Sequence, residues 1–249
     1  MDVRWLTAFI DRPADSFELA VRFWSALTRS TLSPPRGDTG EFATLLPPDG
    51  DPYLRVQRVA EGTGGTHLDL HVDDVDEFAR SAIAAGAVEH RRHGGLAVLR
   101  SPAGLPWCAV AHHGEAVRPA PQEAGDTGEL HLIDQLCIDI PASRFDDECE
   151  FWSRVTSWEL RRSSVRSEFA YLVRPEGCPL RLMLQRCDDG AVRAHLDVAS
   201  SDVETVVAHH LRLGAVAGAH FEYWTVMADP AGRPYCVTAR DPVTGSLAS

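Results

Sequence analysis

Two stretches of the sequence, HLDLHVDD at residues 67–74 and HLDVASSD at residues 195–202, match at a shift of 128 positions. Cys108 and Cys236 are related by the same shift, and Phe-Trp-Ser, Gly-Ala-Val and Pro-Ala-Gly each recur at it. A shift that stays constant over so many motifs predicts two copies of one unit, each about 115 residues long.

The elements within each copy follow from the pattern around these stretches. Alternating apolar residues over 67–72 predict a strand, and Asp74 is placed to cap a helix over 75–85 that Gly86 closes. Each copy shows the order strand, helix and three strands twice, so we expect an α+β fold with two βαβββ modules per copy. The other elements predicted in the first copy are a strand over 6–10, a helix over 14–28, and strands over 42–46, 53–59 and 107–110.

The composition is that of an ordinary soluble globular protein. Among 249 residues, 44% are hydrophobic and 24% charged, and the formal net charge is −12 at pH 7. No apolar stretch approaches the roughly 20 residues of a membrane helix, and the excess of acid argues against a nucleic-acid partner. The first residues lack a signal sequence, and the six cysteines show no CxxC spacing, so we expect a cytoplasmic protein with reduced thiols.

A segment rich in Pro, Gly and Glu separates the two copies, which is typical of a surface linker. The predicted domains are therefore residues 1–115 and 130–242, with a linker over 116–129 and a flexible tail over 243–249. We expect either a monomer whose two domains pack as a pseudo-dimer or a homodimer.

Each copy resembles the vicinal oxygen chelate superfamily, which includes glyoxalase I, bleomycin-resistance proteins and extradiol dioxygenases. The resemblance is carried in the first copy by Phe-Trp-Ser, HLDLHVDD, Gly-Ala-Val and SPAGLPWCAV at 101–110, and in the second by FWS, HLDVASSD, GAV and ADPAGRPYCVTA at 228–239. The sequence is most similar to the bacterial glyoxalase-like domain group, in which the last motif ends in Cys. The resemblance implies two tandem domains, each with its mixed sheet curled into a cup that holds a ligand or a metal.

Metal-dependent members of the superfamily take ligands from the first, fifth and last strands, often two His and a Glu. By the resemblance, these positions fall on Trp5, His67 and Cys108 in the first copy, and on Ile133, His195 and Cys236 in the second. A tryptophan or an isoleucine cannot coordinate a cation, and one imidazole with a thiol is a poor ligand set. We therefore expect neither cup to hold a metal, and no cofactor; the alternative is a zinc site built from the histidine and the cysteine of a cup.

Strand alternation predicts which side chains face the cup. The predicted ligand-binding set in the first copy combines aromatic and polar groups: Trp5, Thr7, Phe9, Arg55, Gln57, His67, Asp69, His71 and Cys108. The corresponding set in the second copy has fewer polar groups: Gln185, His195, Asp197 and Cys236. Apolar surface with a few polar groups suits a small organic ligand, so we expect the first cup to be the functional one.

Three functions are compatible with these residues. The first is binding of a small aromatic or amphipathic compound in a metal-free cup, chiefly in the first domain, as in bleomycin-resistance proteins. The second is a metal-independent isomerase or lyase, in which His67 and Asp69 are the catalytic pair for proton transfer. The third, a metal-dependent lyase or dioxygenase, is disfavoured by the residues at the ligand positions.

Two histidine features also have a purely structural interpretation. The His-x-Asp pair occurs in both copies, which favours mutual satisfaction of His67 and Asp69 inside a half-buried cup over catalysis. The adjacent pair His209-His210 falls on a predicted helix, where we expect both side chains to face the solvent.

Overall fold

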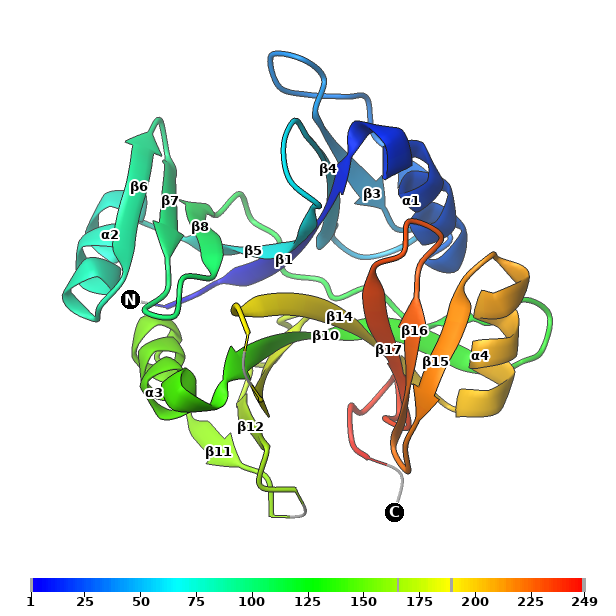
Figure 1. Cartoon of the computed structure of the whole chain (residues 1–249). Helices are drawn as coiled ribbons and strands as arrows, with labels where there is room; N and C mark the ends of the chain where they lie inside the picture. The colour runs from blue at the N-terminus through cyan, green and yellow to red at the C-terminus, as the bar shows by residue number, and fades with distance from the viewer. Residues whose placement is uncertain (1, 165, 189, 248–249) are drawn as a thin grey trace. The chain divides into compact units, whose positions relative to one another are not determined.

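The computed structural model describes residues 2–164, 166–188 and 190–247. Within them, the chain forms two mixed β-sheets and four α-helices (Figure 1). The first sheet consists of β1 (Trp5–Pro13), β2 (Thr31–Leu32), β3 (Phe42–Leu46), β4 (Leu54–Val59), β5 (Gly65–Val72), β6 (Val88–His93), β7 (Leu96–Arg100) and β8 (Pro106–Ala111). The second consists of β9 (Gln122–Glu123), β10 (Leu130–Pro141), β11 (Leu160–Arg162), β12 (Phe169–Leu172), β13 (Arg181–Cys187), β14 (Arg193–Ser200), β15 (Val216–His220), β16 (Trp224–Ala228) and β17 (Pro234–Thr238). The helices are α1 (Ala14–Leu27), α2 (Val75–Ala84), α3 (Phe145–Thr156) and α4 (Val203–Arg212), with a 3-10 turn, η1, at Ala142–Arg144.

Each sheet is built from one sequence repeat. The strand order is β2-β3-β4-β1-β5-β8-β7-β6 in the first sheet and β11-β12-β13-β10-β14-β17-β16-β15 in the second, with β9 paired to β10. Along the chain, each repeat has strand, helix and three strands twice, which confirms the predicted α+β fold with two βαβββ modules per repeat. None of the described helices is long and apolar enough to cross a membrane.

The chain also divides into two compact units that do not coincide with the repeats. Unit 1 contains Met1–Phe9, Thr66–Val117 and Leu136–Ala194, and unit 2 contains Ile10–Gly65, Arg118–Gln135 and His195–Ser249. Each unit thus takes most of one βαβββ module from each repeat. The domain boundaries predicted from the sequence stay predictions.

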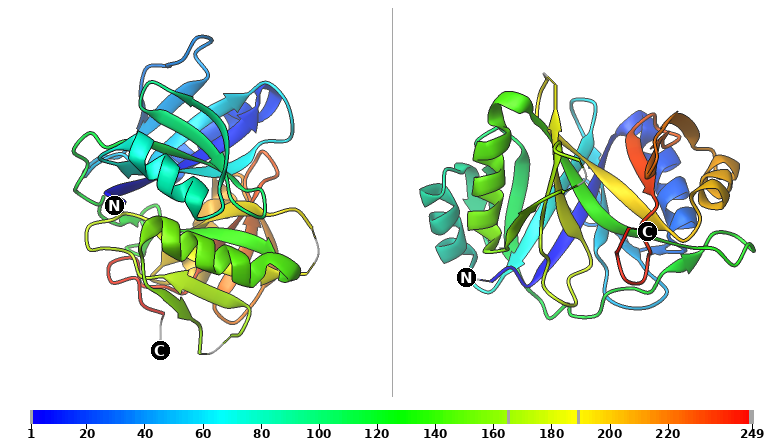
Figure 2. Two further views of the ribbon diagram at one scale, coloured as in Figure 1. Left: turned by 90° about the vertical axis from the view of Figure 1, so that its left-hand side faces the viewer. Right: turned by 90° about the horizontal axis from the view of Figure 1, so that it is seen from below.

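In unit 1, helix α2 packs on β7 and β8, and α3 lies beside α2 (Figure 2). The interior holds an edge-to-face aromatic cluster, in which the Trp107 ring lies 6.3 Å from Phe78 and 5.7 Å from Trp152, centroid to centroid. The indole N–H of Trp152 donates to Glu148 at 2.9 Å. This bond offsets the cost of burying the one polar atom of the Trp152 ring.

In unit 2, helix α4 packs on β15, β16 and β17, as Figure 1 shows, and α1 packs on β4. Trp24 lies in the interior, with its ring 5.1 Å from Phe23 and 5.2 Å from Tyr235. Its indole N–H donates to Asp229 at 3.1 Å, and the same carboxylate pairs with Arg12 at 2.5 Å. The Arg12 side chain is only 3% exposed, so this is a buried ion pair.

Local sequence signals set the starts of α2 and α4, and the predicted cap at Asp74 is confirmed. Asp74 caps α2 by accepting a hydrogen bond from the backbone N–H of Glu77 at 2.8 Å. Asp202 caps α4 in the same way through the N–H of Thr205, also at 2.8 Å. The first-turn amides of a helix lack intrahelical partners, which explains why an acid recurs at both positions.

The Gly-Ala-Val and Pro-Ala-Gly motifs recur together for a structural reason. Gly86 follows α2 with φ 114°, and Gly214 follows α4 with φ 99°, a backbone conformation that glycine adopts without strain. A Cβ at either position would lie 3.5 Å from the ring of Pro102 or Pro230. Each glycine therefore reverses the chain close against the proline of the second motif.

Candidate functional site

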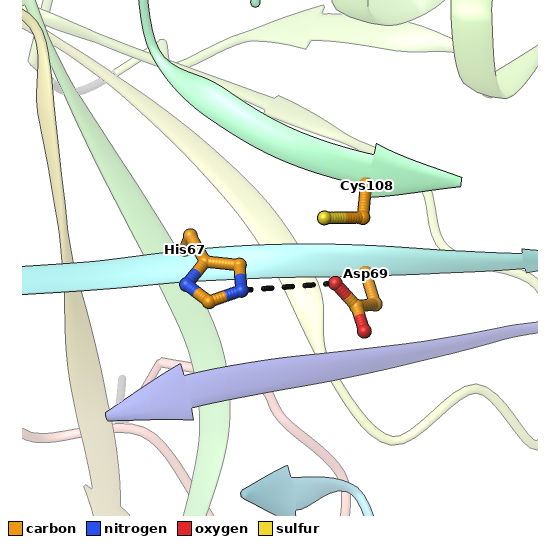
Figure 3. Close-up of side chains that lie close together, drawn as sticks. All are labelled: His67, Asp69 and Cys108. Atoms are coloured by element: carbon orange, nitrogen blue, oxygen red, sulfur yellow. Dashed lines mark ion pairs between the residues drawn. The ribbon is translucent and has the colours of Figure 1, made fainter. Parts of the chain in front are cut away.

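The candidate site lies on β5 of the first repeat, where His67, Asp69 and Cys108 come together (Figure 3). His67 and Asp69 are two residues apart in one strand, so both side chains leave the same face, with Nε2 3.8 Å from Oδ1. Cys108 on β8 is the register partner of Asp69. One ligand atom from each residue lies within 4.8 Å of the other two. The sequence predicted all three residues, and the structure places them in one cluster.

An aromatic ring covers the histidine of this cluster. Phe9 on β1 stacks on His67, with ring centroids 4.4 Å apart and an angle of 12° between the planes. The His67 side chain is 15% exposed and that of Asp69 6%, while Cys108 is half-buried. Phe9 is itself only 5% exposed, so His67 is the accessible part of the stack. A ring of this kind beside polar groups can supply both apolar contact and orientation to a small ligand.

A second polar group continues along the same strand. His71 Nε2 lies 2.9 Å from Thr7 Oγ1, and His71 Nδ1 lies 3.6 Å from a carboxylate oxygen of Glu115. His112 Nε2 is also 3.6 Å from that carboxylate. Burial opposes the charge on Glu115, but its own and the His113 backbone N–H groups and the two neighbouring histidines outweigh burial, so its pKa is lowered. An anionic Glu115 thus faces two imidazoles.

The sequence analysis missed Glu115. This residue follows β8 by four positions, directly before the segment predicted as a surface linker. A single glutamate in a stretch of Gly, Pro and His has no pattern that marks it as folding back onto a strand. The only available signal was its proximity in sequence to His112.

The second repeat places the same three residue types on β14 and β17. His195 Nε2 lies 3.3 Å from Asp197 Oδ1 and 3.7 Å from the sulfur of Cys236. Asp197 also accepts a hydrogen bond from the side-chain amide of Gln135. All four residues are less than a tenth exposed. This second cluster is therefore a closed, hydrogen-bonded group.

The remaining predicted ligand-binding residues lie on strands of both units. Trp5 on β1 is fully buried, with 0% of its surface exposed. Arg55 and Gln57 are half-buried on β4 in unit 2. Gln185 is half-buried on β13, where its side-chain oxygen accepts from the Cys137 thiol at 3.6 Å. That these side chains contact a ligand stays a prediction.

A buried chain of polar rings runs through the interior of unit 2. The Tyr235 hydroxyl lies 3.1 Å from His210 Nδ1, and His210 Nε2 lies 3.1 Å from His131 Nδ1. Burial lowers the pKa of His131 to about 4, holds the pKa of His210 well below its usual range, and raises the pKa of Tyr235. The three groups are therefore neutral at pH 7.

The prediction that the pair His209-His210 faces the solvent is wrong for His210, which is 0% exposed. Val206 and His210 are four residues apart and form the buried stripe of α4. Polar atoms from β10 and β17 satisfy the two ring nitrogens of His210. The helical period places His210 on the buried face of α4. Strands that are distant in the sequence supply the hydrogen-bond partners that offset the cost of burying its ring.

A sequence model described as a glyoxalase-like domain matches residues 7–110 and 135–238, once in each repeat. No match was found among curated proteins. Solved structures of similar fold include a Mn(II)-bound glyoxalase from Novosphingobium aromaticivorans, at 16% identity and TM-score 0.62, covering 99% of this chain and 86% of that one. The 2,3-dioxygenase LapB from a Pseudomonas species matches at 13% identity and TM-score 0.66, covering 96% and 92%. A 2,2',3-trihydroxybiphenyl 1,2-dioxygenase from Sphingomonas wittichii matches at 16% identity and TM-score 0.61, covering 95% and 90%.

The donor atoms of the described residues decide whether this site could hold a divalent cation. Trp5, at the family's first-strand position, offers no ligand atom. Asp69 offers one instead, so an imidazole, a carboxylate and a thiol are grouped within 4.8 Å in the first repeat, which fits a divalent cation. The expectation of metal-free cups considered only the family's ligand positions and did not count Asp69; it stays a prediction.

Proposed function

The chain belongs to the glyoxalase-like domain family of the vicinal oxygen chelate superfamily, and on that footing we propose that it binds a small organic molecule at the β5 face of its first repeat. The observation that carries the proposal is the Phe9–His67 stack beside Asp69 and Cys108. The proposed ligand is aromatic or amphipathic. Its apolar part would contact the stack, and a hydroxyl or similar polar group would reach the histidine and the aspartate.

The residues at equivalent positions favour the first repeat over the second as the ligand-binding site. Phe9 corresponds to Cys137, and His71 corresponds to Ala199, at the shift of 128. The second repeat therefore has neither the aromatic ring nor the third polar residue at those positions. The closed cluster around His195 supports a structural role there.

This binding function needs no metal, because every group that recognises the ligand is a side chain of the protein. A divalent cation at this site would be held by His67, Asp69 and Cys108, and would supply Lewis-acid polarisation of a ligand oxygen.

The six cysteines are present as thiols, which supports the proposal of a cytoplasmic protein.

A second candidate function is proton transfer on the bound molecule, as in an isomerase or lyase. Its support is the distance of 3.8 Å between the imidazole nitrogen of His67 and the carboxylate of Asp69. In this function, Asp69 orients the ring and His67 accepts and returns a proton. Asp69 would then act as a positioning residue.

The test is a fluorescence titration of the full chain with a panel of small aromatics and amphiphiles, starting with catechol. We expect saturable binding that His67→Gln weakens at least tenfold and that the matched control His195→Gln leaves unchanged in a folded variant. Turnover that is lost in His67→Gln while affinity is retained would favour the proton-transfer function. Loss of binding in His195→Gln alone would contradict the assignment to the first repeat.

A further inference from the structure

Two arginines of unit 2 meet at one threonine on the face of β3 and β4. Arg36 lies in the loop before β3, and its guanidinium donates to the Thr44 hydroxyl at 2.8 Å and to the Ser33 hydroxyl at 3.4 Å. Arg55 on β4 is the register partner of Thr44 in this antiparallel pair. Register partners leave the same face of a sheet, with Cβ atoms about 4.5–5.5 Å apart. Thr44 is thus bonded to one arginine and lies opposite a second.

This face is the one that β3 and β4 turn away from the apolar core. Ala43 and Val56, which alternate with Thr44 and Arg55 along the strands, are both buried. Thr44 is 6% exposed and Arg55 is half-buried, whereas Arg36 is exposed. A small molecule in solvent therefore has direct access to the Arg36 guanidinium.

The positive charge of Arg36 is not neutralised by a neighbouring acid. Within residues 2–164, 166–188 and 190–247, its guanidinium makes no ion pair and bonds only to neutral hydroxyls. Glu41, in the same loop, accepts from the N–H and the hydroxyl of Thr39 at 2.9 Å instead. Burial and the charge of Arg55 both lower the pKa of Arg36, although a guanidinium stays protonated at pH 7. Two like charges held this close both gain from an anion placed between them.

The second repeat has neither arginine at the equivalent positions. Arg55 corresponds to Met183 at the shift of 128, and the register partner of Met183 is Tyr171. The loop residue whose N–H bonds the carbonyl of the first residue of the strand is Arg36 before β3 and Ser163 before β12. Because β12 and β13 pair in the same way without either arginine, the strand pairing does not require them.

We infer that Arg36, Thr44 and Arg55 form a binding site for a small oxyanion, a carboxylate or a phosphate group. The planar guanidinium donates two parallel N–H bonds to either group, which makes arginine the usual partner of both. The Thr44 hydroxyl accepts from Arg36 and donates to none of the described residues, so its hydrogen is available to the anion. The inference goes beyond the proposed ligand binding at β5 and does not depend on it, because none of the three residues belongs to the His67 cluster.

The test is isothermal titration calorimetry of the full chain with inorganic phosphate and, in separate runs, with acetate at the same ionic strength. We expect one site per chain, and the anion that binds more tightly tells a phosphate site from a carboxylate site. Arg36→Gln and Arg55→Met should each weaken binding at least tenfold; the second introduces the residue type found at position 183. Binding should also weaken as salt is raised, because the contacts are between charges.

The matched control is Arg58→Gln, which removes the same charge from the same strand. The Arg58 guanidinium lies 4.8 Å from the ring centroid of Phe17 on α1, so it is on the opposite face of β4 from Arg55. This variant should bind the anion with unchanged affinity. Circular dichroism shows that each variant is folded.

The inference is overturned if the folded wild-type chain binds neither anion saturably, or if binding persists in the double variant Arg36→Gln/Arg55→Met. An equal loss in Arg58→Gln would also overturn it, because the anion would then respond to charge in general and not to this site. No aromatic probe is present in the titration, so failure here leaves the ligand-binding proposal at β5 standing.

Discussion

The two His–Asp–Cys clusters occupy equivalent positions in the two repeats, yet their surroundings differ. In the first repeat, Phe9 stacks on His67 at 4.4 Å and the histidine is partly exposed. In the second, the residue equivalent to Phe9 is Cys137, and the amide of Gln135 donates to Asp197. One cluster has an aromatic ring and access to solvent, and the other is closed.

This difference indicates that a His–Asp–Cys cluster alone does not define a functional site. The His–Asp ion pair recurs in both repeats, at 3.8 Å in the first and 3.3 Å in the second. In the proposed function, ligand binding depends on neighbours that differ, and in the first repeat these are Phe9, His71 and Glu115. A motif search would score the two clusters equally, whereas their contacts separate them.

The interiors of the two units differ in a related way. Positions occupied in unit 1 by Val3, Ala82 and Trp107 are occupied in unit 2 by His131, His210 and Tyr235. Apolar packing in one unit is thus replaced by a hydrogen-bonded chain of neutral rings in the other. The replacement makes unit 2 sensitive to acid through these residues.

The largest effect is expected at Asp229 and Glu148, the carboxylates that accept hydrogen bonds from Trp24 and Trp152. Asp229→Ala leaves the buried Arg12 guanidinium without its counterion, and we expect a loss of about 3–5 kcal/mol in the free energy of unfolding. Glu148→Ala removes the acceptor of Trp152 and of the Ala103 N–H, and should cost about 1–3 kcal/mol. Urea unfolding of the full chain measures both losses. Equal losses would contradict the expectation that removing the counterion of a buried guanidinium costs more than removing a hydrogen-bond acceptor.

Acid should destabilise the protein through the ring chain of unit 2. The pKa of His131 is about 4 in the folded protein and about 6.5 in the unfolded chain, so the unfolded state takes up protons first as the pH falls. The contribution of His131 to the free energy of unfolding is therefore fully present above about pH 6.5 and is lost as the pH falls toward 4. We expect a loss on the order of 3 kcal/mol from this histidine.

Replacing the two histidines with the residues of unit 1 tests the origin of this effect. In His131→Val/His210→Ala, the free energy of unfolding at pH 7 should fall, but its decrease between pH 6.5 and 4.5 should become shallower. His90→Gln, on the exposed surface of β6, is the control and should keep the wild-type slope. An unchanged slope in the double variant would show that other groups carry the acid sensitivity.

The aromatic ring over His67 should matter for ligand affinity more than for folding. Phe9→Leu keeps apolar volume but removes the stack, and we expect the affinity for the best-binding aromatic of the panel to fall about 2- to 10-fold. Cys137→Ala, at the equivalent position, should leave the affinity unchanged. The same fluorescence titration measures both, and an equal effect of the two substitutions would remove the distinction between the repeats.

The smallest effect should be the same in both repeats. Asp74→Ala and Asp202→Ala each remove one capping hydrogen bond of 2.8 Å, and each should cost about 1 kcal/mol of unfolding free energy. Thermal or urea unfolding of the two variants provides the comparison. Losses that differ several-fold would mean that the two helix starts are not equivalent.

Much of the fold could be predicted because its signals are local. The shift of 128 established the duplication, and alternation and capping residues placed the elements around His67 and Asp74. The two-residue strands β2 and β9 are too short to show any alternation. Their positions depend on pairing with a longer strand, β2 with β3 and β9 with β10.

The candidate site was predicted in part. Strand parity placed His67 and Asp69 on one face, and the family resemblance pointed to Cys108 on the last strand. Glu115 and His210 were missed or misplaced, because their burial depends on partners from other elements. Neither a helix nor a linker sequence reveals such partners by itself.

The most direct test of the central claim is native mass spectrometry of the full chain, purified without chelator or added metal and then mixed with the best-binding aromatic of the panel. We predict one organic molecule per chain, retained in His195→Gln and lost in His67→Gln. Two molecules per chain, or an adduct that survives His67→Gln and disappears in His195→Gln, would contradict the account that the first repeat is the binding domain.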